Sequence, residues 1–184
     1  MKVTSPKSFV SIGILAFIAF IGTWALAADT ASIDKHVAAT LTRFDALSPK
    51  HPDMVAHAVG VLVFPRITKA GVGLGGEHGD GALSAGGKTV GYYSVSSASI
   101  GLTLGAAQHS EVLVFTTQEA LNQFTSSKGW SVGADTGVAM ISKGGGGNYD
   151  TETLKKPVVG FVFAEKGLIG DASLEGSKID RLDK

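Results

Sequence analysis

The sequence has no cysteine among its 184 residues. This absence excludes disulfide bonds, thiolate metal ligands and a cysteine nucleophile. It also excludes the lipid-modified cysteine that anchors bacterial lipoproteins. Excess charge is lacking as well, because 16 basic residues balance 16 acidic ones. Nucleic-acid-binding domains usually carry a strongly basic surface, so we expect no nucleic-acid partner.

No Ser-His-Asp catalytic set can be assembled from residue order. Glu77, His78 and Asp80 form the only dense cluster of metal-ligating residue types, and His109 with Glu111 is a looser pair. Zinc sites combine three or four ligands at defined spacings, which these residues do not show. We therefore expect a protein that is not an enzyme and has no metal or cofactor.

The first 27 residues have the features of an export signal. Lys2 and Lys7 precede an apolar stretch, Phe9–Leu26, and Ala25-Leu26-Ala27 supplies a small-x-small cleavage pattern. An uncleaved anchor is the alternative, because the stretch approaches the ~20 residues that span a bilayer. Cleavage near Ala27–Ala28 predicts a periplasmic or secreted protein. Residues 28–184 would then form one domain with a net charge of −2.

Two glycine motifs resemble nucleotide-binding loops. Gly71–Gly76 satisfies G-x-G-x-x-G, and Ala82–Thr89 fits a loosened P-loop pattern. Both nucleotide motifs require a helix directly after the loop. The first motif is followed by EHGDGALSAGG, and the second by the β-rich Val90–Val95. We therefore predict no nucleotide binding and a hairpin turn at Gly86-Gly87.

Apolar periodicity predicts one long helix near the start of the mature chain. Its apolar face consists of residues spaced by three or four, namely Ile33, Val37, Leu41, Phe44 and Leu47. Ser48-Pro49 ends this helix, because a residue before proline avoids helical geometry. A short helix follows Pro52 and reaches Ala58. A third begins at a Thr116 or Thr117 cap and runs through Phe124.

Strands are predicted for most of the remaining chain. Period-2 alternation and β-branched runs indicate strands over 61–64, 71–75, 81–85, 89–95, 99–104, 111–115, 130–140, 158–164, 168–174 and 178–181. A glycine-rich loop is expected over Lys143–Tyr149. Many short strands with few helices predict an α+β fold. We expect a curved or barrel-like, mostly antiparallel sheet with an N-terminal amphipathic helix and a few short helices.

Four sequence segments resemble the SYLF domain family: VLVFPRITKAG, GALSAGGKTVGYY, GWSVGAD and KPVVGFVFAEKGLIGDASLEGSKI. The resemblance covers roughly Ile33 to Arg181. It implies kinship with exported bacterial proteins and with eukaryotic domains that bind phosphoinositides and actin. Some bacterial relatives are lipoproteins, from which this cysteine-free chain departs. In eukaryotic relatives the first helix contacts membranes. Here its polar face has mixed charge, which favours packing on the domain's own sheet.

Cationic residues at predicted turns are the candidate lipid-binding site. Arg66 and Lys69 bracket the turn between the first two predicted strands, Lys88 lies at another turn, and Lys143 opens the glycine-rich loop. Cationic side chains attract anionic headgroups, although turns also carry lysine for solubility alone. With the resemblance, this pattern predicts an exported, non-enzymatic domain that binds anionic phospholipid at a membrane surface. The alternative is a structural or protein-interaction module with a partner in the cell envelope.

Overall fold

The computed structural model of the protein describes residues 15–132, 137–141, 151–164, 167–168 and 176–184. Four helices and seven strands lie within these ranges. Among these residues, no helix combines the length and the apolar character needed to cross a membrane. The predicted glycine-rich loop at 143–149 and most of the strand predicted at 168–174 lie outside the described residues.

Three of the four described helices cover the segments predicted to be helical, although the first begins well before Ile33 and the last was not predicted. The first, α1 (Leu15–Leu47), ends directly before Ser48-Pro49, and α2 (His51–His57) has its proline in the first turn. Helix α3 (Gln118–Ser126) is capped by Thr117, whose hydroxyl oxygen accepts a hydrogen bond from the Ala120 backbone N–H at 3.3 Å. This cap satisfies one of the free N–H groups at the helix start. A single turn, α4 (Thr151–Leu154), completes the set.

Two very long strands form the centre of the molecule. Strand β1 (Gly60–Ala85) and strand β2 (Lys88–Phe115) pair antiparallel along nearly their whole lengths. The expectation of six separate strands over this segment was wrong, because the residues expected between them, such as 65–70 and 105–110, continue the two long strands. The turn prediction is confirmed, since Gly86 and Gly87 join the two strands with φ angles of 57° and 76°. Such positive φ values favour glycine.

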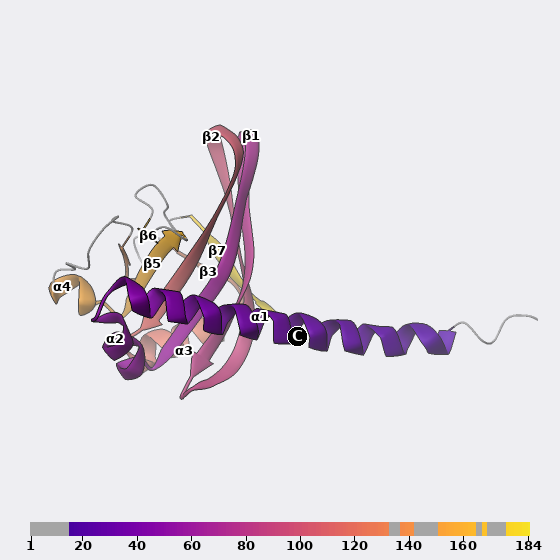
Figure 1. The fold of residues 1–184 in the computed structure, drawn as a ribbon, viewed down its shortest axis with the longest axis horizontal. Helices are drawn as coiled ribbons and strands as arrows, with labels where there is room; N and C mark the ends of the chain where they lie inside the picture. Colours follow the sequence, from indigo (N-terminus) through magenta and orange to yellow (C-terminus); the bar gives the residue numbers. More distant parts are fainter. Residues whose placement is uncertain (1–14, 133–136, 142–150, 165–166, 169–175) are drawn as a thin grey trace, which may run out of the picture.

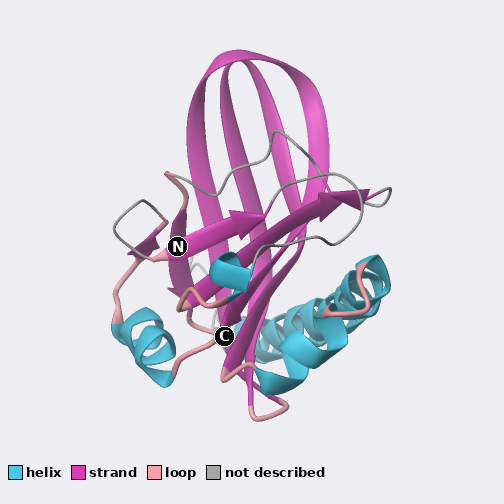
Figure 2. Cartoon of the chain, turned by 90° about the vertical axis from the view of Figure 1, so that its left-hand side faces the viewer, coloured by secondary structure: helices cyan, strands magenta, loops and turns pink. Residues whose placement is uncertain are grey.

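This hairpin folds over on itself like an arch (Figures 1 and 2). The first and last parts of β1, which we call its two legs, cross at Gly79 and Gly81. A Cβ atom on Gly79 would lie 2.5 Å from the Arg66 carbonyl oxygen, and one on Gly81 would overlap the Val63 carbonyl. Glycine is therefore required at this crossing for close backbone approach rather than for a turn. We call the crossing the seam.

The remaining strands extend the sheet from β2. Strand β5 (Val158–Ala164) and strand β7 (Lys178–Leu182) pair with opposite parts of β2. The edge strands are β3 (Trp130–Ser131), β4 (Val138–Ile141) and β6 (Gly167–Leu168). Only β4 with β5 is a parallel pair among the strand pairs described. This curved, mostly antiparallel sheet with an N-terminal helix confirms the predicted α+β class.

Two hydrophobic cores hold the arch together. The inner core lies between the legs, contains Phe64, Leu83 and Tyr93, and is closed at one end by Phe124 of α3. The outer core lies between the sheet and α1, whose Ile33, Val37 and Phe44 are buried against it. Burying such side chains contributes roughly 1.5–3 kcal/mol each. The predicted apolar face of α1 therefore packs on the domain's own sheet.

Candidate functional site

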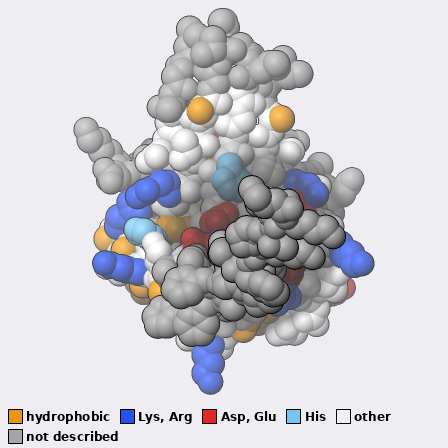
Figure 3. Space-filling model, turned by 90° about the vertical axis from the view of Figure 1, so that its right-hand side faces the viewer, with side chains coloured by type: hydrophobic (Ala, Val, Ile, Leu, Met, Phe, Trp, Pro, Cys, Tyr) orange, Lys and Arg blue, Asp and Glu red, His pale blue; other side chains and the backbone are white. Residues whose placement is uncertain are grey.

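A groove lies where α1 crosses the seam. Its volume is about 790 Å³, within the range typical of small-molecule sites. Its lining comes from α1, both legs of β1 and the C-terminal part of β2: Asp29, Ile33, His36, Ala39, Thr40, Arg43, Pro65, Arg66, Asp80, Gln108, His109 and Ser110. On the face seen in Figure 3, acidic side chains gather in the hollowed centre and Lys and Arg side chains surround it.

Arg66 reaches the groove because β1 has a bulge at this point. Phe64 pairs with Glu111 and Ile67 with His109, so two residues, Pro65 and Arg66, stand opposite the single Ser110. Proline lacks the N–H that a regular ladder would need, which favours a bulge here. Bulges redirect side chains and often border functional sites. The Arg66 side chain is exposed, and no described residue forms a hydrogen bond or ion pair with it.

Arg43 enters the groove from α1 and is held by hydroxyl groups. Its Nη2 donates hydrogen bonds to Thr40 Oγ1 at 3.0 Å and to Ser110 Oγ at 3.4 Å. The Ser110 hydroxyl in turn donates to the Pro65 carbonyl at 2.8 Å. This chain of hydrogen bonds ties the end of α1 to the bulge. Among the described residues, no carboxylate neutralises Arg43.

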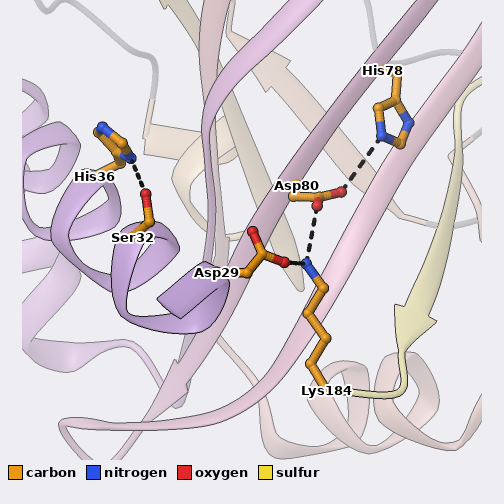
Figure 4. A network of polar contacts seen from close by, with 6 residues as sticks. All are labelled: Asp29, Ser32, His36, His78, Asp80 and Lys184. Atoms are coloured by element: carbon orange, nitrogen blue, oxygen red, sulfur yellow. Dashed lines mark hydrogen bonds and ion pairs between the residues drawn. The ribbon is translucent and has the colours of Figure 1, made fainter. Parts of the chain in front are cut away.

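A second polar network marks the other part of the groove (Figure 4). The Lys184 ammonium donates to the carboxylate of Asp29 on α1 and, at 3.2 Å, to that of Asp80 on β1. His78 lies 3.5 Å from Asp80 on the same strand. Burial alone would lower the pKa of Lys184, but its hydrogen bonds to both carboxylates raise it. Lys184 therefore stays charged. Its contacts with Asp29 and Asp80 attach α1 at Asp29 to the seam.

Two charged pairs lie at the legs of the arch, and only the His109–Glu111 pair is buried. The His109 imidazole contacts the Glu111 carboxylate at 3.0 Å, and the Lys69 ammonium contacts Glu77 at 3.0 Å across the two legs of β1. Glu111 is only 1% exposed, and its Oε2 atom has no hydrogen-bond partner. Burial raises the pKa of Glu111, although the neighbouring His109 opposes the shift. A buried carboxylate with one unsatisfied oxygen is costly.

The structure separates the four predicted site residues. Arg66 lines the groove, whereas Lys69 is outside the lining and forms an ion pair with Glu77. Both lie within β1 rather than at a turn, so that placement was wrong: the chain continues through a bulge. Lys88 is exposed beside the Gly86-Gly87 turn, as predicted, and Lys143 lies outside the described residues.

Sequence reasoning did not identify Arg43 as a site residue. A pattern was present, because Asp29, Ile33, His36, Thr40 and Arg43 follow helical spacing and all line the groove. The sequence did not show that this stripe crosses the bulge at Arg66. That contact joins residues 67 positions apart in the chain, Arg43 and Ser110.

The other candidate motifs occupy strands. Gly71–Gly76 lies inside β1 with no helix after it, so the nucleotide fingerprint lacks its structural context. Glu77 points to Lys69, while His78 and Asp80 contact one another. Within the described ranges, no three acidic or histidine side chains are arranged to hold a metal ion.

The second part of the chain resembles the Ysc84 (SYLF) family. The family model described as "Ysc84: Las17-binding protein actin regulator" matches residues 96–184. A search of curated proteins found no match to the chain. The matched segment begins inside β2 and includes Gln108, His109 and Ser110 of the groove. The two groove arginines lie before it.

Proposed function

We propose that the protein is an exported, non-enzymatic domain that binds anionic phospholipid through the groove between α1 and the seam. The observation that carries this proposal is the position of Arg66. This exposed cation lies in a bulge, lines the groove and has no partner among the described residues. Cleavage near Ala27–Ala28 would release it to the periplasm or the exterior. N-terminal sequencing of the accumulated protein tests this processing, and a retained Met1 would indicate an anchor.

Local charge must provide the attraction to lipid. The mature chain has a net charge of −2, so its overall field does not favour an anionic surface. Lys69 contributes little, because Glu77 neutralises it. Arg43 and Arg66 remain without acidic partners among the described residues. Cations near an anionic membrane contribute about 1 kcal/mol each.

The packing of α1 favours surface contact over insertion. Its apolar residues Ile33, Val37 and Phe44 are 7%, 6% and 0% exposed. Inserting this face into a bilayer would require the helix to leave the outer core. The docked helix instead offers the polar residues along its groove side. This supports electrostatic binding, which salt weakens because exposed charges are screened over ~8 Å at physiological ionic strength.

Vesicle sedimentation tests the proposal with the protein in the form that accumulates in the cell. We expect pelleting with phosphatidylglycerol vesicles and not with phosphatidylcholine alone. Replacing Arg66 and Lys69 by alanine should weaken binding more than replacing Lys155 and Lys156, and most of that loss should come from Arg66→Ala alone. Lys155 pairs with Glu152 on an exposed turn, so the second pair controls for charge loss.

Three other outcomes would contradict parts of this proposal. Equal losses from both pairs would indicate diffuse attraction without a site. Binding unchanged at molar salt would point to apolar contacts and remove the cation argument. An absence of pelleting with every lipid would favour the alternative, a structural or protein-interaction module of the cell envelope.

A further inference from the structure

We infer that Arg43 and Arg66 together form a subsite for one phosphate group at the bulge. The inference deepens the proposed function, on which it rests for a phospholipid headgroup as the source of that phosphate. Free phosphate has the same binding chemistry. The subsite differs from general surface attraction because it requires two guanidinium groups held in one place.

The first step of the argument is positional. Arg43 lies on α1 and Arg66 on β1, yet the Ser110 hydroxyl bonds to both elements, accepting from Arg43 and donating to Pro65. Pro65 directly precedes Arg66 in the bulge. The two arginines therefore line the same part of one groove. Hydrogen bonds to Thr40 and Ser110 use only Nη2 of Arg43, so other N–H donors of its guanidinium are available.

The second step concerns charge. Asp29 and Asp80, the acidic residues of the groove lining, both contact Lys184. Neither forms an ion pair with an arginine among the described residues. Asp29 is 14 positions before Arg43 on α1, which corresponds to roughly 21 Å along the helix axis. The groove lining holds two arginines and two aspartates, and Lys184, which lies outside the lining, contacts both aspartates. The two arginines therefore keep their positive charge without an acidic partner among the described residues.

The third step is ligand chemistry. A guanidinium presents a planar fork of N–H donors that matches two oxygens of a phosphate group, which an ammonium cannot reproduce. Two such forks match the several oxygens and negative charge of one phosphate. Arg43 is held by hydroxyl groups rather than by a carboxylate, so its charge is not neutralised among the described residues. A phosphate group satisfies both the free donors and the excess charge.

The test uses two double variants and a matched control. Arg43→Gln with Arg66→Gln removes both charges, and Arg43→Lys with Arg66→Lys keeps the charges but loses the forks. Lys35→Gln with Lys128→Gln removes two exposed charges that do not line the groove. Binding is measured to phosphatidylglycerol vesicles and, by calorimetry, to inorganic phosphate. Thermal unfolding verifies that every variant is folded.

We expect both double arginine variants to bind vesicles at least about tenfold more weakly than the Lys35→Gln, Lys128→Gln control. We also expect inorganic phosphate to compete with vesicles for the protein. If vesicles bind but the Arg→Gln and control variants lose affinity equally, the subsite is wrong and the lipid function stands. Full binding by the Arg→Lys variant also refutes the subsite.

Phosphate binding that needs both arginines, without any vesicle binding, supports the subsite and identifies soluble phosphate as its source. In that case the lipid function is wrong. If neither phosphate nor vesicles bind, the subsite and the lipid function are both wrong.

Discussion

Replacing Gly79 by alanine should damage both the fold and the groove. A Cβ atom there would lie 2.5 Å from the Arg66 carbonyl oxygen and 2.9 Å from Ile67 Cγ1. The first contact is with backbone, which cannot rotate away, so the legs of β1 must separate at the seam. Overpacking of this kind costs about 1–3 kcal/mol.

Gly76→Ala is the matched control on the same strand. The closest atom to its added Cβ would be the Ser97 carbonyl oxygen at 3.6 Å, an ordinary contact. Replacing glycine by alanine at a compatible position stabilises by about 0.4–1 kcal/mol through the unfolded state. We therefore expect the two variants to differ by about 2.5 kcal/mol in free energy of unfolding. This corresponds to roughly 5–10 °C in Tm for a domain of this size.

Thermal and urea unfolding followed by circular dichroism measures this difference. Gly79→Ala should also weaken binding to anionic vesicles, because the displaced backbone carries Arg66, whereas Gly76→Ala should not. Equal Tm values for the two variants would refute the close crossing of the legs. A loss of stability with unchanged vesicle binding would support the close crossing of the legs but would show that lipid binding does not depend on it.

Three further predictions concern other parts of the molecule. Burial raises the pKa of Glu111, so Glu111→Gln should increase the free energy of unfolding at pH values above that raised pKa. This gain should disappear as the pH falls from the raised pKa to the pKa of the unfolded chain. A gain that grows in acid would contradict the prediction. Lys184→Met should speed hydrogen exchange at the start of the described part of α1, whereas Lys178→Met, which removes only an ion pair to Asp180, should not; equal exchange in both would refute the link to Asp29 and Asp80. Lys88→Ala should change Tm very little, and micromolar ATP binding lost in that variant would overturn the hairpin interpretation.

Local patterns in the sequence determined the elements whose ends depend on neighbouring residues. Ser48-Pro49 ended α1, Thr117 capped α3, and Gly86-Gly87 formed the hairpin turn. Each result follows from backbone preferences within a few positions, which a sequence displays directly. A run of β-branched and aromatic residues likewise predicted β5, and the many strands with few helices predicted the α+β class.

Tertiary structure alone decided what the glycines do. In the sequence, Gly79 lies between two predicted strands and Gly81 begins one, but in the fold both let two distant backbones cross. The sequence therefore suggested several short strands where the molecule has two long ones. The backbone that approaches these glycines comes from a distant part of the chain, so the residues next to each glycine show no pattern that predicts the contact.

The candidate site was also predicted only in part from the sequence, and the fold decided the rest. Residue type identified Arg66 as a cation, but only the paired register revealed the bulge that turns it toward the groove. Lys69, three residues later, looked equivalent until the folded hairpin placed it against Glu77. Arg43 joined the site because α1 crosses the seam. Charge and periodicity belong to the sequence, whereas neutralisation and proximity depend on contacts between segments that only folding brings together.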